Sequence, residues 1–213
     1  EEQERAVYNL TMKQVDVFTT KPFSGNPAGV ITEADSIPSE LMLSIAGEMS
    51  LAETTFVTSP SSDAALFRIR FFTPTKEVDL SGHAMIAACY ALVEDGKIPL
   101  EDGVTKVLFE TRDGIAQVDV HFRKNASGKQ SREADSLLTI AGGETGLLEK
   151  IMLHYRVKKH RPSNVNARDI ARILGIDAGE ILRTGLPLEI VSTGLEQLLT
   201  LVSHKETIRD MNP

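Results

Sequence analysis

The chain has 213 residues, 30 of them acidic and 23 basic, which gives a formal net charge of −7. Hydrophobic residues make up 41% of the chain, a share typical of globular proteins that argues against wholesale disorder. The acidic balance argues against nucleic acid as a partner, because non-specific binding to phosphates requires clustered Lys and Arg. The short basic cluster at 156–161 is interpreted as a solvated strand end.

Cysteine content and hydropathy narrow the class of protein further. The single cysteine, Cys89, excludes an intramolecular disulfide, and no Cys and His residues have the spacing of a zinc site. We therefore expect a cytoplasmic protein without a structural metal. No apolar run approaches the roughly 18 residues of a membrane span, so no membrane partner is expected. Residues 1–11 are polar and acidic, and we interpret them as an extension ahead of a natural start at Met12.

The first third of the chain alternates between short β-rich runs and one helical stretch. A helix is predicted over 38–49, because Leu41, Ile45 and Met49 recur on one face and Pro38 stands near its start. Strands are predicted on both sides of this helix, at 14–19, 28–32, 53–58 and 65–72. This order is typical of a mixed, largely antiparallel sheet.

The segment 79–93, DLSGHAMIAACYALV, is the most informative part of the chain. After His83 almost every residue is small or apolar, so a helix over 81–93 has no face for water and is expected to be buried on all sides. A sheet wrapped around the helix satisfies this pattern. The helix N-terminus at Ser81, Gly82 and His83 would then lie inside the molecule, where its unpaired backbone N–H groups form an anion site.

The rest of the chain continues as short strands and helices. A polar stretch at 123–135 is predicted to be an exposed loop. The glycine-rich 141–146 is interpreted as a turn, because it lacks the Lys-Ser/Thr pair of a phosphate-binding loop. Strands are predicted at 105–110, 115–122, 136–140, 150–157, 188–192 and 198–202, and helical segments at 166–174, 178–183 and 204–213.

Glu53 is the first candidate for chemistry. A carboxylate at the start of an apolar strand is unexpected, since burying its charge is costly unless it is paired or protonated. Such a carboxyl group suits the transfer of protons near neutral pH. The alternative remains open that Glu53 lies on the solvent face of a half-exposed strand.

His83 is the second candidate, because histidine titrates near neutrality and a helix N-terminus favours its neutral form. It could exchange a proton with an anionic substrate, or it could be a core histidine bonded to the backbone. Asp79 could orient the imidazole or simply precede the helix. Cys89 has no neighbouring base in the sequence and is interpreted as an inert core thiol.

Several strings agree in order and spacing with one protein family. They are MKQVDVFTTKPFSGNPAGVI, SLAETTFV and FFTPTKEVDLSGHAMIAACYAL, followed later by VSTGLEQLLTLV. Together they resemble the PhzF-like isomerases, the phenazine biosynthesis-like family. The resemblance implies an α+β fold of the diaminopimelate-epimerase-like type. In that fold each of two lobes is a mainly antiparallel sheet around a central helix, and the active site lies in the cleft between the lobes.

The resemblance also assigns roles to particular residues. Glu53 matches the proton-shuttling glutamate of the family and His83 its active-site histidine. Gly82 and Ser81 fall in the anion-binding turn, and Asn26 and Asp79 are further candidates for substrate binding. One cysteine cannot supply the two opposed thiols that related epimerases use.

The resemblance further implies how the chain is divided. A first lobe is expected over 12–185 and the beginning of a second over 186–213. The second acidic residue and the Thr-Gly-Ser-type helix start of the family do not follow Val191, so the remainder of the second lobe is expected to be absent.

The leading hypothesis is a cofactor-independent isomerase that moves a proton within a small carboxylated metabolite. The alternatives are an epimerase or racemase of amino or hydroxy acids, a non-catalytic binding protein, or an inactive fragment. A homo-oligomer, most simply a dimer, is expected, because an incomplete second lobe would expose apolar surface.

Overall fold

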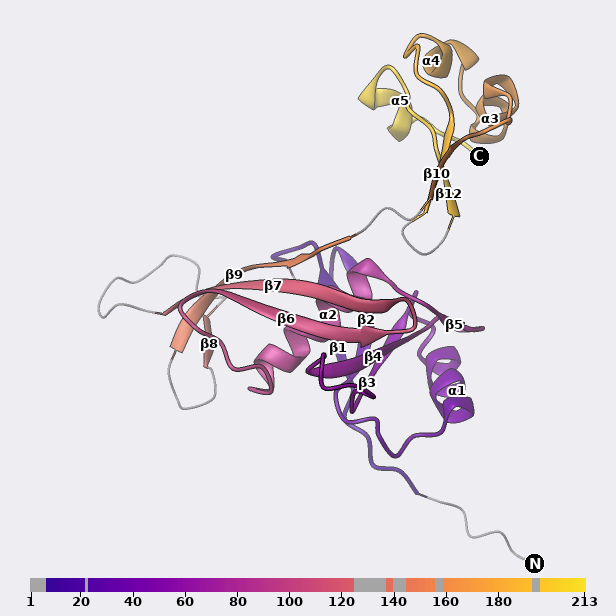
Figure 1. The fold of residues 1–213 in the computed structure, drawn as a ribbon. Helices are drawn as coiled ribbons and strands as arrows, with labels where there is room; N and C mark the ends of the chain where they lie inside the picture. Colours follow the sequence, from indigo (N-terminus) through magenta and orange to yellow (C-terminus); the bar gives the residue numbers. More distant parts are fainter. Residues whose placement is uncertain (1–6, 22, 125–136, 140–144, 156–158, 193–195) are drawn as a thin grey trace, which may run out of the picture. The chain divides into compact units, whose positions relative to one another are not determined.

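The computed structural model describes residues 7–21, 23–124, 137–139, 145–155, 159–192 and 196–213. The chain divides into two compact units, Glu1–His154 and Tyr155–Pro213 (Figure 1). The lobe boundary expected between residues 185 and 186 lies within the second unit and stays a prediction. Residues 125–135 of the loop predicted at 123–135, and residues 141–144 of the turn predicted at 141–146, lie outside the described residues. The remaining residues of both segments contradict the prediction, because Arg123 and Lys124 end one strand and Thr145 and Gly146 begin another.

A mixed, mainly antiparallel sheet forms most of the first unit, as predicted. Its strand order is β1-β2-β3-β4-β6-β7-β9-β8, with β5 paired to β4. Only the pairs β2–β3 and β4–β6 are parallel among the described strands. The strands are β1 Lys13–Val17, β2 Asn26–Ile31, β3 Thr54–Thr58, β4 Phe67–Phe72, β5 Glu77–Val78, β6 Gly103–Thr111, β7 Gly114–Lys124, β8 Leu137–Thr139 and β9 Thr145–Leu153.

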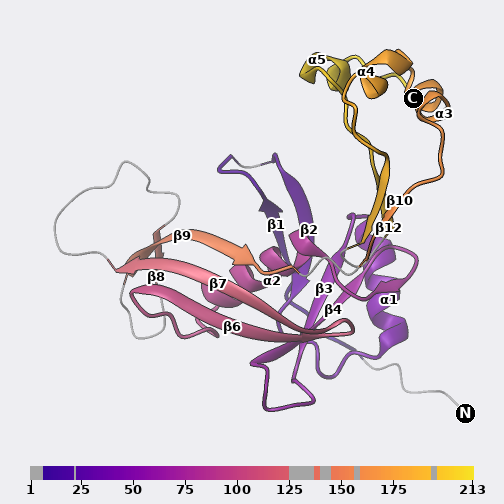
Figure 2. The same ribbon diagram turned by 45° about the horizontal axis from the view of Figure 1, so that its top comes forward.

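Helix α2, Gly82–Glu94, is enclosed by this sheet (Figures 1 and 2). It contacts strands near both ends of the sheet, β1 and β9, which is possible only because the sheet curls around it. Its alanines allow the strands to approach closely. The buried residues of α2 are Ala84, Met85, Ala87, Ala88, Cys89, Ala91, Leu92 and Val93. Burial on all sides was expected, but Ile86 and Tyr90 are only partly covered.

Helix α1, Ser39–Met49, packs on the opposite face of the sheet. Met42 of this helix lies in one cluster with Phe56 and Phe72, whose rings meet edge to face at a centroid distance of 5.3 Å. Val57, the neighbour of Phe56, belongs instead to the core around α2. Strand β3 is therefore buried on both faces, and its first four residues, Thr54 to Val57, are all buried.

The second unit is smaller and has its own core of Ala171, Ile181 and Leu188. Three antiparallel strands, β10 Lys159–Pro162, β11 Glu189–Ser192 and β12 Glu196–Leu199, form its sheet. Its helices are α3 Ala167–Leu174, α4 Ala178–Leu182 and α5 Lys205–Arg209. Among the helices of the described residues, none is long and apolar enough to cross a membrane.

An ion pair between Arg70 and Glu77 holds the segment that leads into α2. The Arg70 Nε and Nη2 atoms donate to the two carboxylate oxygens of Glu77, each at 2.8 Å, and Nη2 also donates to Ser39 Oγ at 3.0 Å. Both charged side chains are only 17% exposed. Strand β4, strand β5 and the start of α1 are thus joined four residues before Ser81.

We predict that Glu77→Gln lowers the free energy of unfolding by about 2 kcal/mol, because Arg70 would stay largely buried without its bidentate partner. The hydrogen bonds from Arg70 hold the pKa of the Glu77 carboxyl below its ordinary value of 4.5, against burial, which raises it. The ion pair therefore contributes its full stabilisation at pH values above the ordinary pKa of 4.5. This stabilisation is lost as the pH falls through the lowered pKa of Glu77.

Urea denaturation between pH 3 and pH 7 tests this prediction. This range of about four pH units includes the pH at which carboxyl groups ordinarily titrate. Glu33→Gln is the control, since Glu33 pairs with Lys97 but its side chain is 84% exposed. Equal stability of the wild type and the Glu77→Gln variant across this range would contradict the proposed anchoring.

Candidate active site

Glu53 stands immediately before β3, and the backbone of β2 fixes its position. The N–H of Gly29 donates to the carbonyl of Glu53 at 3.0 Å. Because side chains alternate along a strand, Glu53 shares a face with Thr55 and Val57, and Val57 packs in the core around α2. A Cβ at Gly29 would lie 3.1 Å from Thr54 Oγ1, so glycine permits this close approach. The Glu53 side chain is thereby directed toward α2.

His83, the second residue of α2, meets Glu53 there. The distance from His83 Nδ1 to Glu53 Oε2 is 3.6 Å, and the two side chains are 14% and 13% exposed. Ser81 Oγ lies 3.4 Å from the same Nδ1 atom. Two segments 30 residues apart in the sequence thus supply one cluster of a carboxyl group, an imidazole and a hydroxyl group.

Two atoms of this cluster are buried without a hydrogen-bond partner in the described part of the chain: Glu53 Oε2 and His83 Nε2. A buried polar atom that lacks a partner costs about 1–3 kcal/mol. Natural proteins satisfy most such atoms, and the exceptions concentrate where function requires them. The two atoms are therefore the points at which this cluster can contact a ligand.

The backbone at the start of α2 adds hydrogen-bond donors to the same place. Gly82 is the first helical residue, and the N–H of Met85 donates to the carbonyl of Ser81 at 3.0 Å. The amides before Met85 belong to the helix end that has no intrahelical acceptors. They carry the positive end of the helix dipole and can bind an anion beside His83.

The other two predicted site residues lie outside this cluster. Asn26 begins β2 opposite Val17, and no hydrogen bond or ion pair among the described residues joins it to Glu53 or His83. Asp79 is 56% exposed and pairs with Arg112 Nε at 3.5 Å. Their proposed roles in substrate binding stay predictions.

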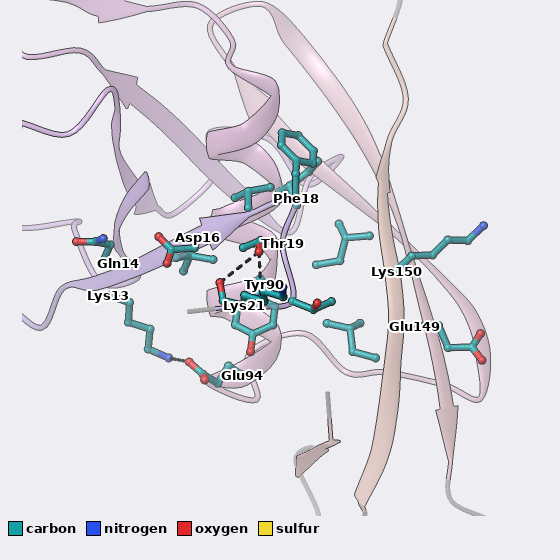
Figure 3. A pocket seen from close by; sticks show the side chains of 16 residues that line it. Lys13, Gln14, Asp16, Phe18, Thr19, Lys21, Tyr90, Glu94, Glu149 and Lys150 are labelled. Atoms are coloured by element: carbon teal, nitrogen blue, oxygen red, sulfur yellow. Dashed lines mark hydrogen bonds and ion pairs between the residues drawn. The ribbon is translucent and has the colours of Figure 1, made fainter. Parts of the chain in front are cut away.

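A groove of about 1000 Å³ lies elsewhere on the first unit, and sequence reasoning missed it (Figure 3). It is lined by residues 13–21, by 148–151 and by Ile86, Tyr90 and Glu94 of α2. Tyr90 could have indicated the groove, because its polar hydroxyl group is unexpected in an otherwise apolar helix. Neither Glu53 nor His83 lines this groove, so it is separate from the candidate active site.

Within the described ranges, no three His, Cys, Asp or Glu side chains are placed to hold one metal ion. The donors present at the cluster are those of acid–base chemistry: one carboxyl group, one imidazole and the amides of a helix start.

The sequence family described as phenazine biosynthesis-like protein matches residues 15–213. An uncharacterized isomerase of Clostridium acetobutylicum is 32% identical over 206 residues, which cover 97% of this chain and 59% of the relative. The chain thus spans about three fifths of the length of this curated relative.

Solved structures agree with the sequence comparison. The crystal structure of a PhzF-family phenazine biosynthesis protein from Bacillus anthracis has a TM-score of 0.71 and 28% identity, over 96% of this chain and 59% of that one. The structure of a "predicted epimerase" from Pseudomonas aeruginosa has a TM-score of 0.69 and 21% identity, over 95% of this chain and 62% of that one. The second likeness shows the fold alone.

Cys89 provides a test of how tightly α2 is enclosed. Burial raises the pKa of its thiol to about 12 from the ordinary 9.0, so the folded protein should hold about a thousandfold less thiolate than an unfolded chain. We predict slow alkylation by iodoacetamide at pH 8 in buffer and rapid alkylation in urea, measured by mass spectrometry. Alkylation at the rate of a free thiol in buffer would show that α2 is not enclosed.

Proposed function

The chain belongs to the phenazine biosynthesis-like protein family, the PhzF family, and on this premise we propose that it is an isomerase that moves a proton within a small carboxylated metabolite. The predicted α+β, diaminopimelate-epimerase-like fold is confirmed, with its sheet curled around α2. The relative from Clostridium acetobutylicum is itself named an isomerase.

The observation that carries the proposal is the meeting of Glu53 and His83. A carboxyl group and an imidazole are side chains that commonly act as general acids and bases, and these two approach to 3.6 Å at a place that is largely closed to water. Each also has a buried atom, Oε2 or Nε2, without a partner in the described residues. A structural ion pair would be expected to satisfy these atoms.

In the proposed reaction the substrate carboxylate binds to the amides of Gly82 and His83. Glu53 removes a proton from one carbon of the substrate and returns it to another. The helix end stabilises the enolate or dienolate charge that develops in between, because its dipoles are already oriented. Since the net charge of the chain is −7, the attraction for an anion must be local to this helix end.

The chemistry proposed here needs no cofactor, and a cytoplasmic location remains part of the proposal. The buried thiol of Cys89 points into the core around α2 and takes no part in the reaction.

A second candidate is epimerisation or racemisation at a single carbon, with Glu53 and His83 as the two proton carriers. The unpartnered His83 Nε2 favours it, because this atom is buried and available to a ligand. A third candidate is a binding protein that holds a carboxylate without turning it over, which would need the amides of α2 but not the acid–base groups.

We also propose that the chain self-associates, most simply as a dimer. The turn after β1 carries two exposed aromatic side chains, Phe18 at 74% and Phe23 at 99% exposure. Both have positive φ angles, 64° and 60°, a conformation that is unfavourable for bulky side chains. Contact with a second copy of the chain would compensate for this exposure.

Solvent exchange tests the proposed reaction. We predict that the wild type incorporates deuterium from D₂O into at least one member of a panel of small carboxylates, followed by mass spectrometry. Glu53→Gln should lower the exchange rate by at least about a hundredfold, since general acid–base groups contribute roughly 10²–10⁴. Glu48→Gln, an exposed carboxylate on α1, is the matched control and should keep the wild-type rate.

Equal exchange by the wild type and Glu53→Gln would exclude the role of Glu53. If no carboxylate of the panel incorporates deuterium, but calorimetry shows that a carboxylate binds, the binding protein is favoured. Deuterium incorporation only at the substrate α-carbon, with inversion of configuration, would favour the epimerase.

Self-association has its own test. Sedimentation of the wild type at micromolar concentration should show a species heavier than the 23.3 kDa monomer, and Phe18→Ser combined with Phe23→Ser should shift it toward the monomer. A clean monomer in the wild type would overturn the proposal.

A further inference from the structure

Ser81 occupies the N-cap position of α2 but does not cap the helix. An N-cap serine normally accepts a hydrogen bond from the second or third amide of its helix. Ser81 has the extended backbone of an N-cap residue, with φ −133° and ψ 131°, yet its side chain makes no such bond. Two other helices, α3 and α4, do have a side-chain cap: Asn166 accepts from Arg168 N at 2.9 Å and Asp177 from Gly179 N at 2.7 Å.

The Ser81 hydroxyl group is instead turned to the imidazole ring. Ser81 is only 8% exposed, and its Oγ lies 3.4 Å from His83 Nδ1. The carboxylate oxygen Oε2 of Glu53 is the second neighbour of Nδ1, at 3.6 Å. One ring nitrogen therefore faces two oxygens, while the other, Nε2, is buried and has no partner among the described residues.

This asymmetry selects one tautomer of the neutral ring. An ionised carboxylate can only accept a hydrogen bond, and the serine oxygen can accept one as well. The carboxylate therefore favours a proton on Nδ1, and the serine hydroxyl, which can also donate, is able to accept the hydrogen bond from that proton. Nε2 then carries the lone pair and can accept a hydrogen bond or a proton from a ligand.

We propose that Ser81 is a positioning residue that holds His83 in the Nδ1–H tautomer instead of capping α2. The arrangement has two consequences for the same site. It presents His83 Nε2 as an acceptor, and it leaves the amides of His83 and Ala84 without a side-chain cap, so that they stay open to an anion. The catalytic meaning of this arrangement rests on the proposed function, but the tautomer itself does not.

Nuclear magnetic resonance of the protein labelled with ¹⁵N-histidine tests the tautomer directly. The protonated and unprotonated nitrogens of a neutral imidazole have well-separated ¹⁵N shifts, and two-bond correlations to the ring protons identify each. The chain has five histidines, and His83→Gln assigns the signals of the ring in question. The spectra are recorded at a pH at which the ¹⁵N shifts themselves show that the imidazole is neutral.

We expect the Nδ1–H form in the wild type, a shift toward the Nε2–H form in Ser81→Ala, and recovery of the wild-type pattern in Ser81→Thr, which restores the hydroxyl group. Ser81→Gly gives the same readout as Ser81→Ala if the alanine variant folds poorly, because glycine is well tolerated at N-caps. An Nε2–H form in the wild type, or unchanged shifts in the variants without the hydroxyl group, would overturn the proposal.

Thermal unfolding separates positioning from capping. Because no cap is lost, Ser81→Ala should leave the Tm of the protein nearly unchanged, whereas the control Asn166→Ala, which removes a cap that is made, should lower it. A drop in Tm for Ser81→Ala as large as that for Asn166→Ala would show that Ser81 is an ordinary cap. These measurements need no turnover. Their failure would contradict the role of Ser81 alone, whereas failure of the deuterium-exchange test with Glu53→Gln would contradict the proposed function.

Discussion

The enclosure of one apolar helix is the constraint on which the rest of the first unit depends. Helix α2 cannot face water along most of its length, so the sheet must curl until strands near both of its ends reach the helix. The helix therefore starts at a partly buried place, where its first amides lack intrahelical acceptors. The burial of the helix thus leaves these amides beside His83, where we propose that an anion binds.

Strand β3 brings the second half of the site. It runs parallel to β2 and is buried on both faces, by α1 on one and by α2 on the other. A side chain at its start must therefore point into one core or the other, and alternation directs Glu53 toward α2. The Arg70–Glu77 pair ties the strand that precedes α2 to β4, the neighbour of β3. The distance between Glu53 and His83 is consequently set by rigid elements.

Much of this arrangement could be predicted from the sequence, because it depends on local patterns. The small and apolar residues of α2 predict its burial, and runs of apolar and β-branched residues predict where strands occur along the chain. Other features depend on neighbours that are distant in the chain. Asp79 was a candidate partner of His83, but it pairs with Arg112, which follows α2 in the sequence. The turn of Ser81 away from the helix amides and the groove beside Tyr90 likewise follow from tertiary contacts.

We propose that Glu53, His83 and the first amides of α2 form one ligand site. A crystal structure of the chain with a small carboxylate bound tests it most directly. We predict the carboxylate at the amides of Gly82 and His83, with the remainder of the molecule beside Glu53 Oε2 and His83 Nε2. A carboxylate bound only in the groove between β1 and β9, without contact to Glu53 or His83, would show that these residues do not form the ligand site.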